Sequence, residues 1–308
     1  MAIVVCFLVL ALRRAWLELQ QSPGEWDWNQ VGWGWIVAGV LASMASLIPL
    51  AIAWLQILWD FGMPVPWRFG VFVYCLGQLG KYVPGKAMVI LLRAGHLHRQ
   101  GFPIRPSVLS IFMETLMNFA SGALLGGVLI QSMQPPHWLF WSAMVCIPFA
   151  ILGLMPHPFR SIIARISRSR LGTMPPEISQ AVDGHLMART CSWCLVSWLF
   201  QGTALWLFLL GLDSNPELVS WRSWLVCITS ASLGALAGFI AMVPGGAGVR
   251  ELAVMWIMTS IVPAPIAILA AIVSRLGSML AEVLLLGLSW SISGPKMDPS
   301  GLDKDKDS

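Results

Sequence analysis

Charged residues are scarce in this chain: only 11% of its 308 residues are Asp, Glu, Lys or Arg, whereas 57% are hydrophobic. A soluble domain carries about 25% charged residues, so this sequence has too few to cover a water-exposed surface. Each long uncharged run can supply the roughly 20 apolar residues that a membrane-spanning helix needs. The sequence therefore predicts a polytopic membrane protein. The runs lie between Asp27 and Asp60, Glu114 and Arg160, Arg189 and Asp213, and Arg222 and Arg250.

Several chemical signatures are missing as well. The net charge is only +4, and there is no Lys/Arg-rich block of the kind that binds nucleic acid. The five histidines have no metal-ligand spacing, and the single C-x-x-C pair, Cys191 and Cys194, has no second pair beside it. There is no phosphate-binding glycine loop and no nucleophile elbow. We expect no nucleic-acid partner, no metal, no cofactor and no catalytic residues of these familiar kinds.

The hydrophobic pattern predicts an all-α integral membrane bundle of about 6–8 spans. Two further apolar stretches, 69–99 and 221–262, are interrupted by Val-Pro-Gly at 83–85 and 243–245. The first has arms too short to cross a bilayer, which favours two half-helices that enter and leave by one face. The second has longer arms, so re-entrant and spanning arrangements both remain open. The uninterrupted spans are predicted near 2–19, 31–59, 106–132, 137–155, 190–212 and 264–292.

We expect one transmembrane domain over residues 1–292. Its halves, about 31–155 and 190–292, would be joined by a basic amphipathic linker at 157–189 and followed by a disordered cytoplasmic tail at 293–308. Basic residues concentrate in the connections that would then face the cytoplasm, which predicts a protein of the cell membrane with both termini in the cytoplasm. The two broken segments would then enter from opposite sides. Whether the halves form an inverted repeat is left open by the sequence.

Charged residues at membrane depth are costly, so those in the apolar stretches are candidates for a functional site. Arg275 and Glu282 are seven residues apart on one predicted helix, so both can point into the bundle. Two GxxxG pairs, Gly122/Gly126 and Gly234/Gly238, are typical of close helix packing. The full set of charges is Lys81, Lys86, Arg93, Glu114, Arg250, Glu251, Arg275 and Glu282.

The Pro-Gly breaks leave backbone N–H groups without helical partners, and a half-helix N-terminus suits an anion. Arg250 adds a planar fork that can hold a phosphate by two hydrogen bonds, and Lys86 adds a point charge. These residues predict a phosphate-binding pocket inside the membrane. In the alternative, Arg250 pairs with Glu251 or Glu282 and only stabilises the break.

Four segments together resemble the lysylphosphatidylglycerol synthase transmembrane-region family: "LGKYVPGKAMVILLRAGHL" at 79–97, "ETLMN" at 114–118, "MVPGGAGVRELAVMWIM" at 242–258 and "AAIVSRLGSMLAE" at 270–282. The resemblance implies a bundle with internal repeats and broken helices. In bifunctional relatives this domain is associated with moving aminoacylated phosphatidylglycerol between leaflets, while a separate soluble domain makes that lipid. The chain ends at 308 without the aminoacyl-transferase domain, so we expect no synthase activity.

The resemblance also implies site residues in both halves. With Glu282 added from its shared face with Arg275, the candidate substrate-binding residues are Lys81, Pro84, Gly85, Lys86, Arg93, Glu114, Pro244, Gly245, Gly246, Gly248, Arg250, Glu251, Arg275 and Glu282.

The leading functional hypothesis is a flippase that binds a phospholipid or polyprenyl-phosphate head group and moves it between leaflets. One alternative is a membrane transferase that acts on lipid-linked sugars or head groups. Another is a non-transporting subunit that partners an envelope-biosynthesis or glycolipid enzyme. A homodimer through the GxxxG faces is also left open by the sequence.

Overall fold

The computed structural model describes most of the bundle predicted from the sequence. The predicted helix at 2–19, most of the predicted span at 137–155, about half of the linker at 157–189 and the tail after Ser293 lie outside the described residues. The described residues are 31–82, 87–133, 141, 147–148, 151–152, 154–157, 160–161, 176–241, 246 and 248–293.

Five described helices are long and apolar enough to cross a membrane. The spans expected at 31–59, 106–132 and 264–292 are found within a few residues, and the helix expected at 190–212 begins earlier, at Gly184. It begins there because the Asp183 side chain accepts a hydrogen bond from Leu186 N at 2.7 Å and caps the helix. The five helices are α2 (Trp33–Asp60), α5 (Ile104–Leu129), α9 (Gly184–Leu212), α10 (Trp221–Ile240) and α12 (Ala264–Ser293).

The first broken stretch forms a short helical hairpin, here called hairpin 1. It consists of α3 (Trp67–Leu79), the 3-10 turn η2 (Gly80–Tyr82) and α4 (Ala87–Arg99). Thirteen residues of helix rise about 20 Å, short of the roughly 30 Å of a hydrocarbon core. Gly80 lets the arms close, because a Cβ there would lie 2.7 Å from Val89 N. The predicted half-helices are confirmed.

The second broken stretch also turns back on itself, in hairpin 2, which consists of α10 and α11 (Val249–Met258). Gly234 and Gly238 of the predicted GxxxG pair allow this close return. A Cβ at Gly234 would lie 2.6 Å from Val254 Cγ2, and one at Gly238 would lie 3.0 Å from Gly246 Cα. Gly246 has φ of 69°, a backbone conformation that favours glycine. Of the two arrangements left open, the structure has the one in which the chain returns to the end it came from.

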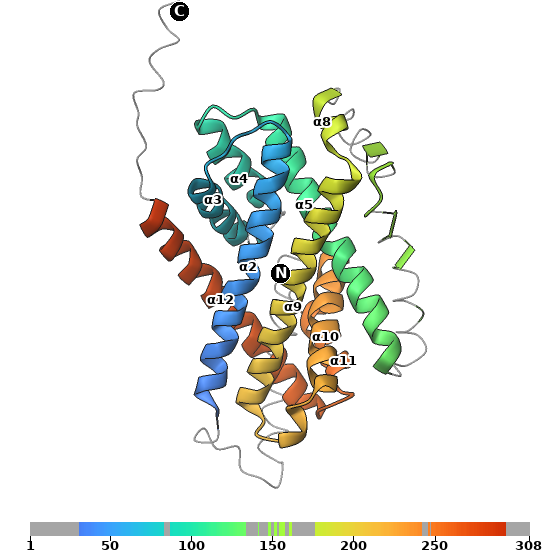
Figure 1. Cartoon of the computed structure of the whole chain (residues 1–308). Coiled ribbons are helices and arrows are strands. Elements are labelled where there is room, and N and C mark those ends of the chain that lie inside the picture. Colours follow the sequence, from blue (N-terminus) through green and yellow to red (C-terminus); the bar gives the residue numbers. More distant parts are fainter. Residues whose placement is uncertain are drawn as a thin grey trace, which may run out of the picture.

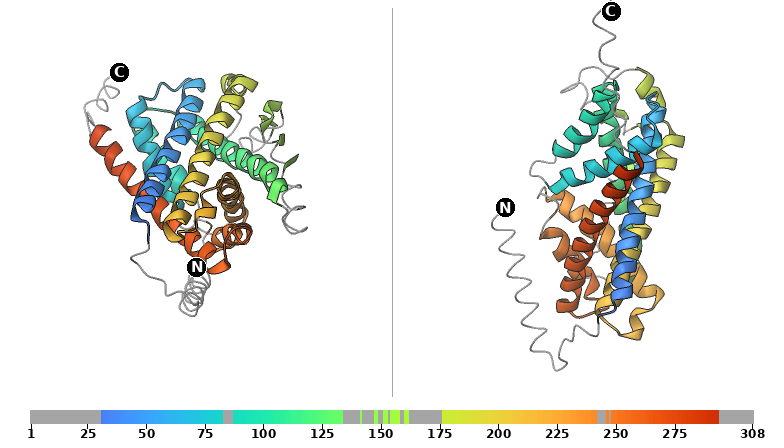
Figure 2. Two further views of the ribbon diagram at one scale, coloured as in Figure 1. Left: turned by 60° about the horizontal axis from the view of Figure 1, so that its bottom comes forward. Right: turned by 90° about the vertical axis from the view of Figure 1, so that its left-hand side faces the viewer.

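The two hairpins lie at opposite ends of the bundle (Figure 1). Helices α2 and α9 pack against each other along the centre, and hairpin 1 follows α2 as hairpin 2 follows α9 (Figures 1 and 2). Each hairpin leads into a further long helix, α5 or α12, that runs to the opposite end (Figure 1). The order α2, hairpin 1, α5 therefore repeats upside down as α9, hairpin 2, α12, which is the arrangement of an inverted repeat.

Each hairpin has its own apolar core. The cluster around hairpin 1 includes Trp54 and Leu97, and the cluster around hairpin 2 includes Leu209, Val254 and Met258, all fully or almost fully buried. Three shorter elements complete the described chain: η3 (Ile130–Met133), α8 (Pro176–Ala181) and η4 (Pro216–Leu218). This duplication brings η2 of hairpin 1 and the start of α11 in hairpin 2 into contact with the same long helix, α12.

Candidate functional site

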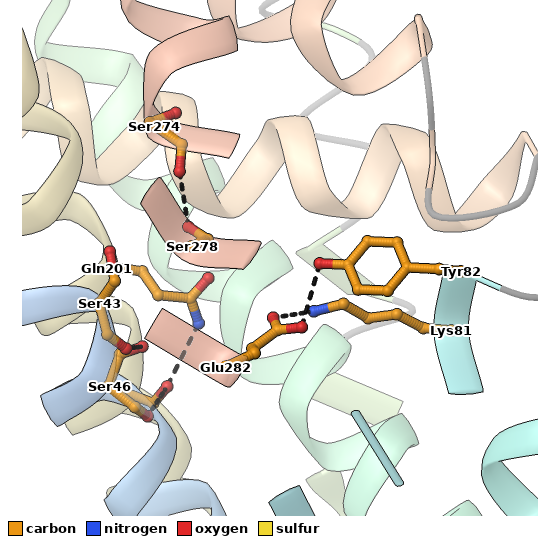
Figure 3. Close-up of polar contacts among 9 residues, drawn as sticks. Ser43, Ser46, Lys81, Tyr82, Gln201, Ser274, Ser278 and Glu282 are labelled. Carbon is orange, nitrogen blue, oxygen red and sulfur yellow. Dashed lines mark hydrogen bonds and ion pairs between the residues drawn. The ribbon is translucent and has the colours of Figure 1, made fainter. Parts of the chain in front are cut away.

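Hairpin 1 delivers two polar side chains to the long helix α12. Lys81 Nζ forms an ion pair with Glu282 Oε1, and Tyr82 Oη donates a hydrogen bond to Glu282 Oε2 at 3.0 Å. Both donors lie in the 3-10 turn η2, at the point where the hairpin reverses inside the bundle. Figure 3 shows Lys81 and Tyr82 reaching toward Glu282 from one side. The Glu282 side chain is almost fully buried, whereas that of Lys81 keeps 35% exposure.

A second ion pair joins hairpin 2 to α12, and in this pair α12 supplies the cation and the hairpin supplies the carboxylate. Arg275 Nη1 lies 2.6 Å from Glu251 Oε1, and Gly248 N donates to Glu251 Oε2 at 2.6 Å. Glu251 is the third residue of α11, so its carboxylate caps the free backbone N–H at the start of that helix. Gly248 supplies the required backbone conformation with φ of 86°. Helix α12 thus offers a carboxylate to hairpin 1 and a cation to hairpin 2.

Arg250 interacts electrostatically with members of both pairs. It is partly buried, and it lies within electrostatic reach of Glu251, Arg275, Tyr82 and Glu282. Within the described part of the chain, no residue forms an ion pair or a hydrogen bond with its guanidinium. The alternative in which Arg250 pairs with Glu251 or Glu282 is therefore wrong for this structure, because Arg275 and Lys81 occupy those carboxylates.

The position of Arg250 adds to its positive surroundings. It is the second residue of α11, where the helix dipole disfavours a cation by about 0.3–1 kcal/mol and favours an anion. The polar centre, defined here as Lys81, Tyr82, Arg250, Glu251, Arg275 and Glu282, contains three cations and two carboxylates. It therefore has one positive charge in excess.

A small cavity touches Arg250 and Glu251. It leaves about 20 Å³ for the centres of water molecules, which is room for one or two waters. Figure 3 shows Ser274 and Ser278 on the same helix as Glu282, with Gln201 of α9 and Ser43 of α2 beside them. The polar side chains that line it are Ser43, Gln201, Arg250, Glu251, Ser274 and Ser278.

Arg93 and Glu114 form a separate buried cluster in the first half. Arg93 Nη1 lies 3.1 Å from Glu114 Oε2, and Tyr74 Oη donates to Glu114 Oε1 at 3.2 Å. The Arg93 guanidinium lies over the rings of Tyr74 and Trp54, at 4.0 and 5.0 Å from their centroids. Gly77 leaves room for it, because a Cβ there would lie 2.5 Å from Arg93 Cγ. This pair ties α4 to α5.

The structure thus divides the residues proposed from the sequence into three groups. Lys81, Gly246, Gly248, Arg250, Glu251, Arg275 and Glu282 come together around the polar centre. Arg93 and Glu114 pair with each other instead. Pro84, Gly85, Lys86, Pro244 and Gly245 lie outside the described residues.

Sequence reasoning missed the neutral polar residues of the site. Tyr82 and Gln201 carry no charge, so a search for charged residues at membrane depth passes over them, although Tyr82 adjoins Lys81 and the Val-Pro-Gly break at 83–85. Ser274 and Ser278 do leave a signal, since they precede Glu282 at intervals of four residues on one helix. A polar stripe at that spacing, in an otherwise apolar span, indicates a face turned away from lipid.

Comparison with known proteins gives one family match. The model of the family described as lysylphosphatidylglycerol synthase TM region matches residues 1–287, nearly the whole chain. No curated protein matches the sequence.

Proposed function

Because the chain belongs to the lysylphosphatidylglycerol synthase TM region family, we propose that it binds the phosphate of a membrane lipid at its polar centre. It then helps the head group to pass between the leaflets. The lipid would be a phospholipid or a polyprenyl phosphate, and the membrane would be the cell membrane. The multi-pass architecture and the two opposed hairpins support this role, because such hairpins bring polar groups to mid-membrane in many transporters.

The observation that carries the proposal is that, among the described residues, the Arg250 guanidinium has no bonded counter-ion. A guanidinium without a bonded counter-ion is costly inside a membrane protein, and here it lies at a helix N-terminus that also favours an anion. The neighbouring Arg275 already has Glu251 as its counter-ion. A phosphate is a suitable ligand, because it can accept two parallel hydrogen bonds from one guanidinium.

Different residues of the site would bind different parts of the head group. Arg250 and Lys81 would hold the phosphate, and the hydroxyls of Ser43, Ser274 and Ser278 would bond the remaining polar atoms of the head group. The sequence contains no nucleotide-binding motif. The lipid would therefore move down its own gradient or be driven by an ion gradient. On α12, the hydroxyls of Ser274 and Ser278 would give the head group polar contacts near Arg275 and on the way to Glu282.

Basic residues at the open end of hairpin 1 favour the proposed orientation. Arg68 is the second residue of α3, Arg99 is the last of α4 and Arg105 is the second of α5, so all three lie at one end of the bundle. The described residues at the other end include Asp213 and Glu217 and one basic residue, Arg222. By the positive-inside rule, hairpin 1 would enter from the cytoplasm.

A vesicle assay tests the proposal. Purified protein in liposomes should speed the transfer of fluorescent phosphatidylglycerol between leaflets, read by dithionite quenching. The Arg250→Ala variant should be at least about 10–100-fold slower, because the loss of even one charge-assisted hydrogen bond costs about 1.5–3 kcal/mol. Arg222→Ala is the matched control, since Arg222 is exposed at the start of α10. Equal rates for wild type and Arg250→Ala would refute the role of Arg250. A lipid product of altered mass would instead favour a transferase.

A further inference from the structure

The two carboxylates of the polar centre are held in different ways. Glu251 has both oxygens engaged by fixed partners, the backbone N–H of Gly248 and the guanidinium of Arg275 on the adjacent helix. Its side chain is 3% exposed. Removing Glu251 would uncap α11 and leave Arg275 without its counter-ion. Glu251 therefore has a structural role and keeps its partners throughout.

Glu282 has partners of another kind. Both of its oxygens are contacted from the tip of hairpin 1, by Lys81 and Tyr82 (Figure 3). Lys81 is a flexible four-carbon chain that remains 35% exposed, so it can turn to another anion without unfolding any helix. Glu282 also lies within electrostatic reach of Arg250. Glu282 is therefore an anion that interacts with both cations that the proposed function assigns to phosphate.

We propose that Glu282 is a resident counter-anion that the lipid phosphate displaces. The inference rests on the proposed function and adds how the site is balanced when no head group is bound. Carboxylate and phosphate both accept charge-assisted hydrogen bonds from Lys and Arg, so they compete for the same donors. When a phosphate binds Lys81 and Arg250, Glu282 gives up Lys81. When the phosphate leaves, Glu282 takes Lys81 back.

This exchange keeps Lys81 paired at membrane depth when no head group is bound, at the cost of weaker head-group binding. It also helps release, because a carboxylate is already in place to replace the departing phosphate. Neutralising Glu282 should therefore strengthen anion binding and slow turnover. A residue that contacted a cationic part of the head group would show the opposite, a loss of binding.

The substitution Glu282→Gln tests this directly. Glutamine keeps the size of the side chain and an oxygen for Tyr82, and it removes the charge. The probe is dihexanoyl phosphatidylglycerol, titrated by calorimetry into protein purified in a neutral detergent. We expect Glu282→Gln to bind it about tenfold more tightly than wild type, a typical coupling between two sites. In vesicles the same variant should have a lower maximal transfer rate.

Glu217→Gln is the matched control, because Glu217 is exposed in η4 and makes the same change of charge. Its affinity should equal that of wild type. If wild type does not bind the probe, the proposed function fails. If wild type binds and Glu282→Gln binds equally or more weakly, only the counter-anion role is overturned.

A second pair of variants covers the case in which Glu282→Gln alone is poorly folded. Lys81→Gln should weaken binding, both by losing a cation and by freeing Glu282 to pair with Arg250. Adding Glu282→Gln to Lys81→Gln should recover at least about fivefold in affinity. A double variant that binds no more tightly than Lys81→Gln would contradict the proposal.

Discussion

The contact between Gly238 and Gly246 gives the sharpest structural prediction. A Cβ placed at Gly238 would lie 3.0 Å from Gly246 Cα and 3.2 Å from Arg250 Cβ. Carbon atoms pack best at about 3.5–4.0 Å, so Gly238→Ala must separate α10 from the start of α11 by roughly 0.5–1 Å. The atom that has to move at Gly246 is backbone, so no side-chain rotation relieves the contact. Such overpacking costs about 1–3 kcal/mol.

The matched control is Gly287→Ala on α12, where nothing lies within 4 Å of the added Cβ. Both variants place alanine in a helix, so the difference between them isolates the contact. In thermal unfolding followed in detergent, Gly238→Ala should be less stable than Gly287→Ala by about 1–3 kcal/mol. It should also transfer lipid more slowly, because the displaced backbone carries Arg250. Equal stability and equal transfer in the two variants would refute the proposed packing of hairpin 2.

Two further predictions concern residues outside the polar centre. Glu114→Gln leaves Arg93 buried without a charged partner, so the free energy of unfolding measured in detergent should fall by about 3–5 kcal/mol. A decrease of less than about 1 kcal/mol would contradict the buried ion pair. The hydrogen bond from Leu186 N holds the pKa of Asp183 below its usual value. The ionised Asp183 side chain therefore stabilises the folded protein above about pH 4, and this stabilisation is lost as the pH falls further. Asp183→Ala should therefore lower the melting temperature at pH 7, and the gap to wild type should narrow below pH 4. Asp183→Ser, which keeps a cap, should melt close to wild type at pH 7.

The fold was largely predictable because its signals are local. Apolar length gave the spans now seen at Trp33–Asp60 and Ala264–Ser293, and the Pro-Gly breaks located both hairpins. Small residues at four-residue spacing indicated the close contact at Gly234 and Gly238. The early start of α9 was missed because it depends on a cap at Asp183, outside the apolar stretch.

The sequence indicated which charged residues lie at membrane depth, but not how they pair. Arg275 and Glu282 were expected to point into the bundle, and both form ion pairs there. Their partners are 24 and 201 residues away, Glu251 and Lys81, and no local pattern in the sequence selects among distant charges. For the same reason the sequence placed Arg93 with the other cations, whereas the packing of α4 on α5 pairs it elsewhere.

Identifying the lipids that stay bound to the gently extracted protein tests the central claim most directly. Mass spectrometry of the wild-type protein should find a phosphate-bearing lipid. That lipid should be depleted in Arg250→Ala and retained in Arg222→Ala. Equal amounts in the two variants, or a bound lipid without a phosphate, would contradict a phosphate site at Arg250.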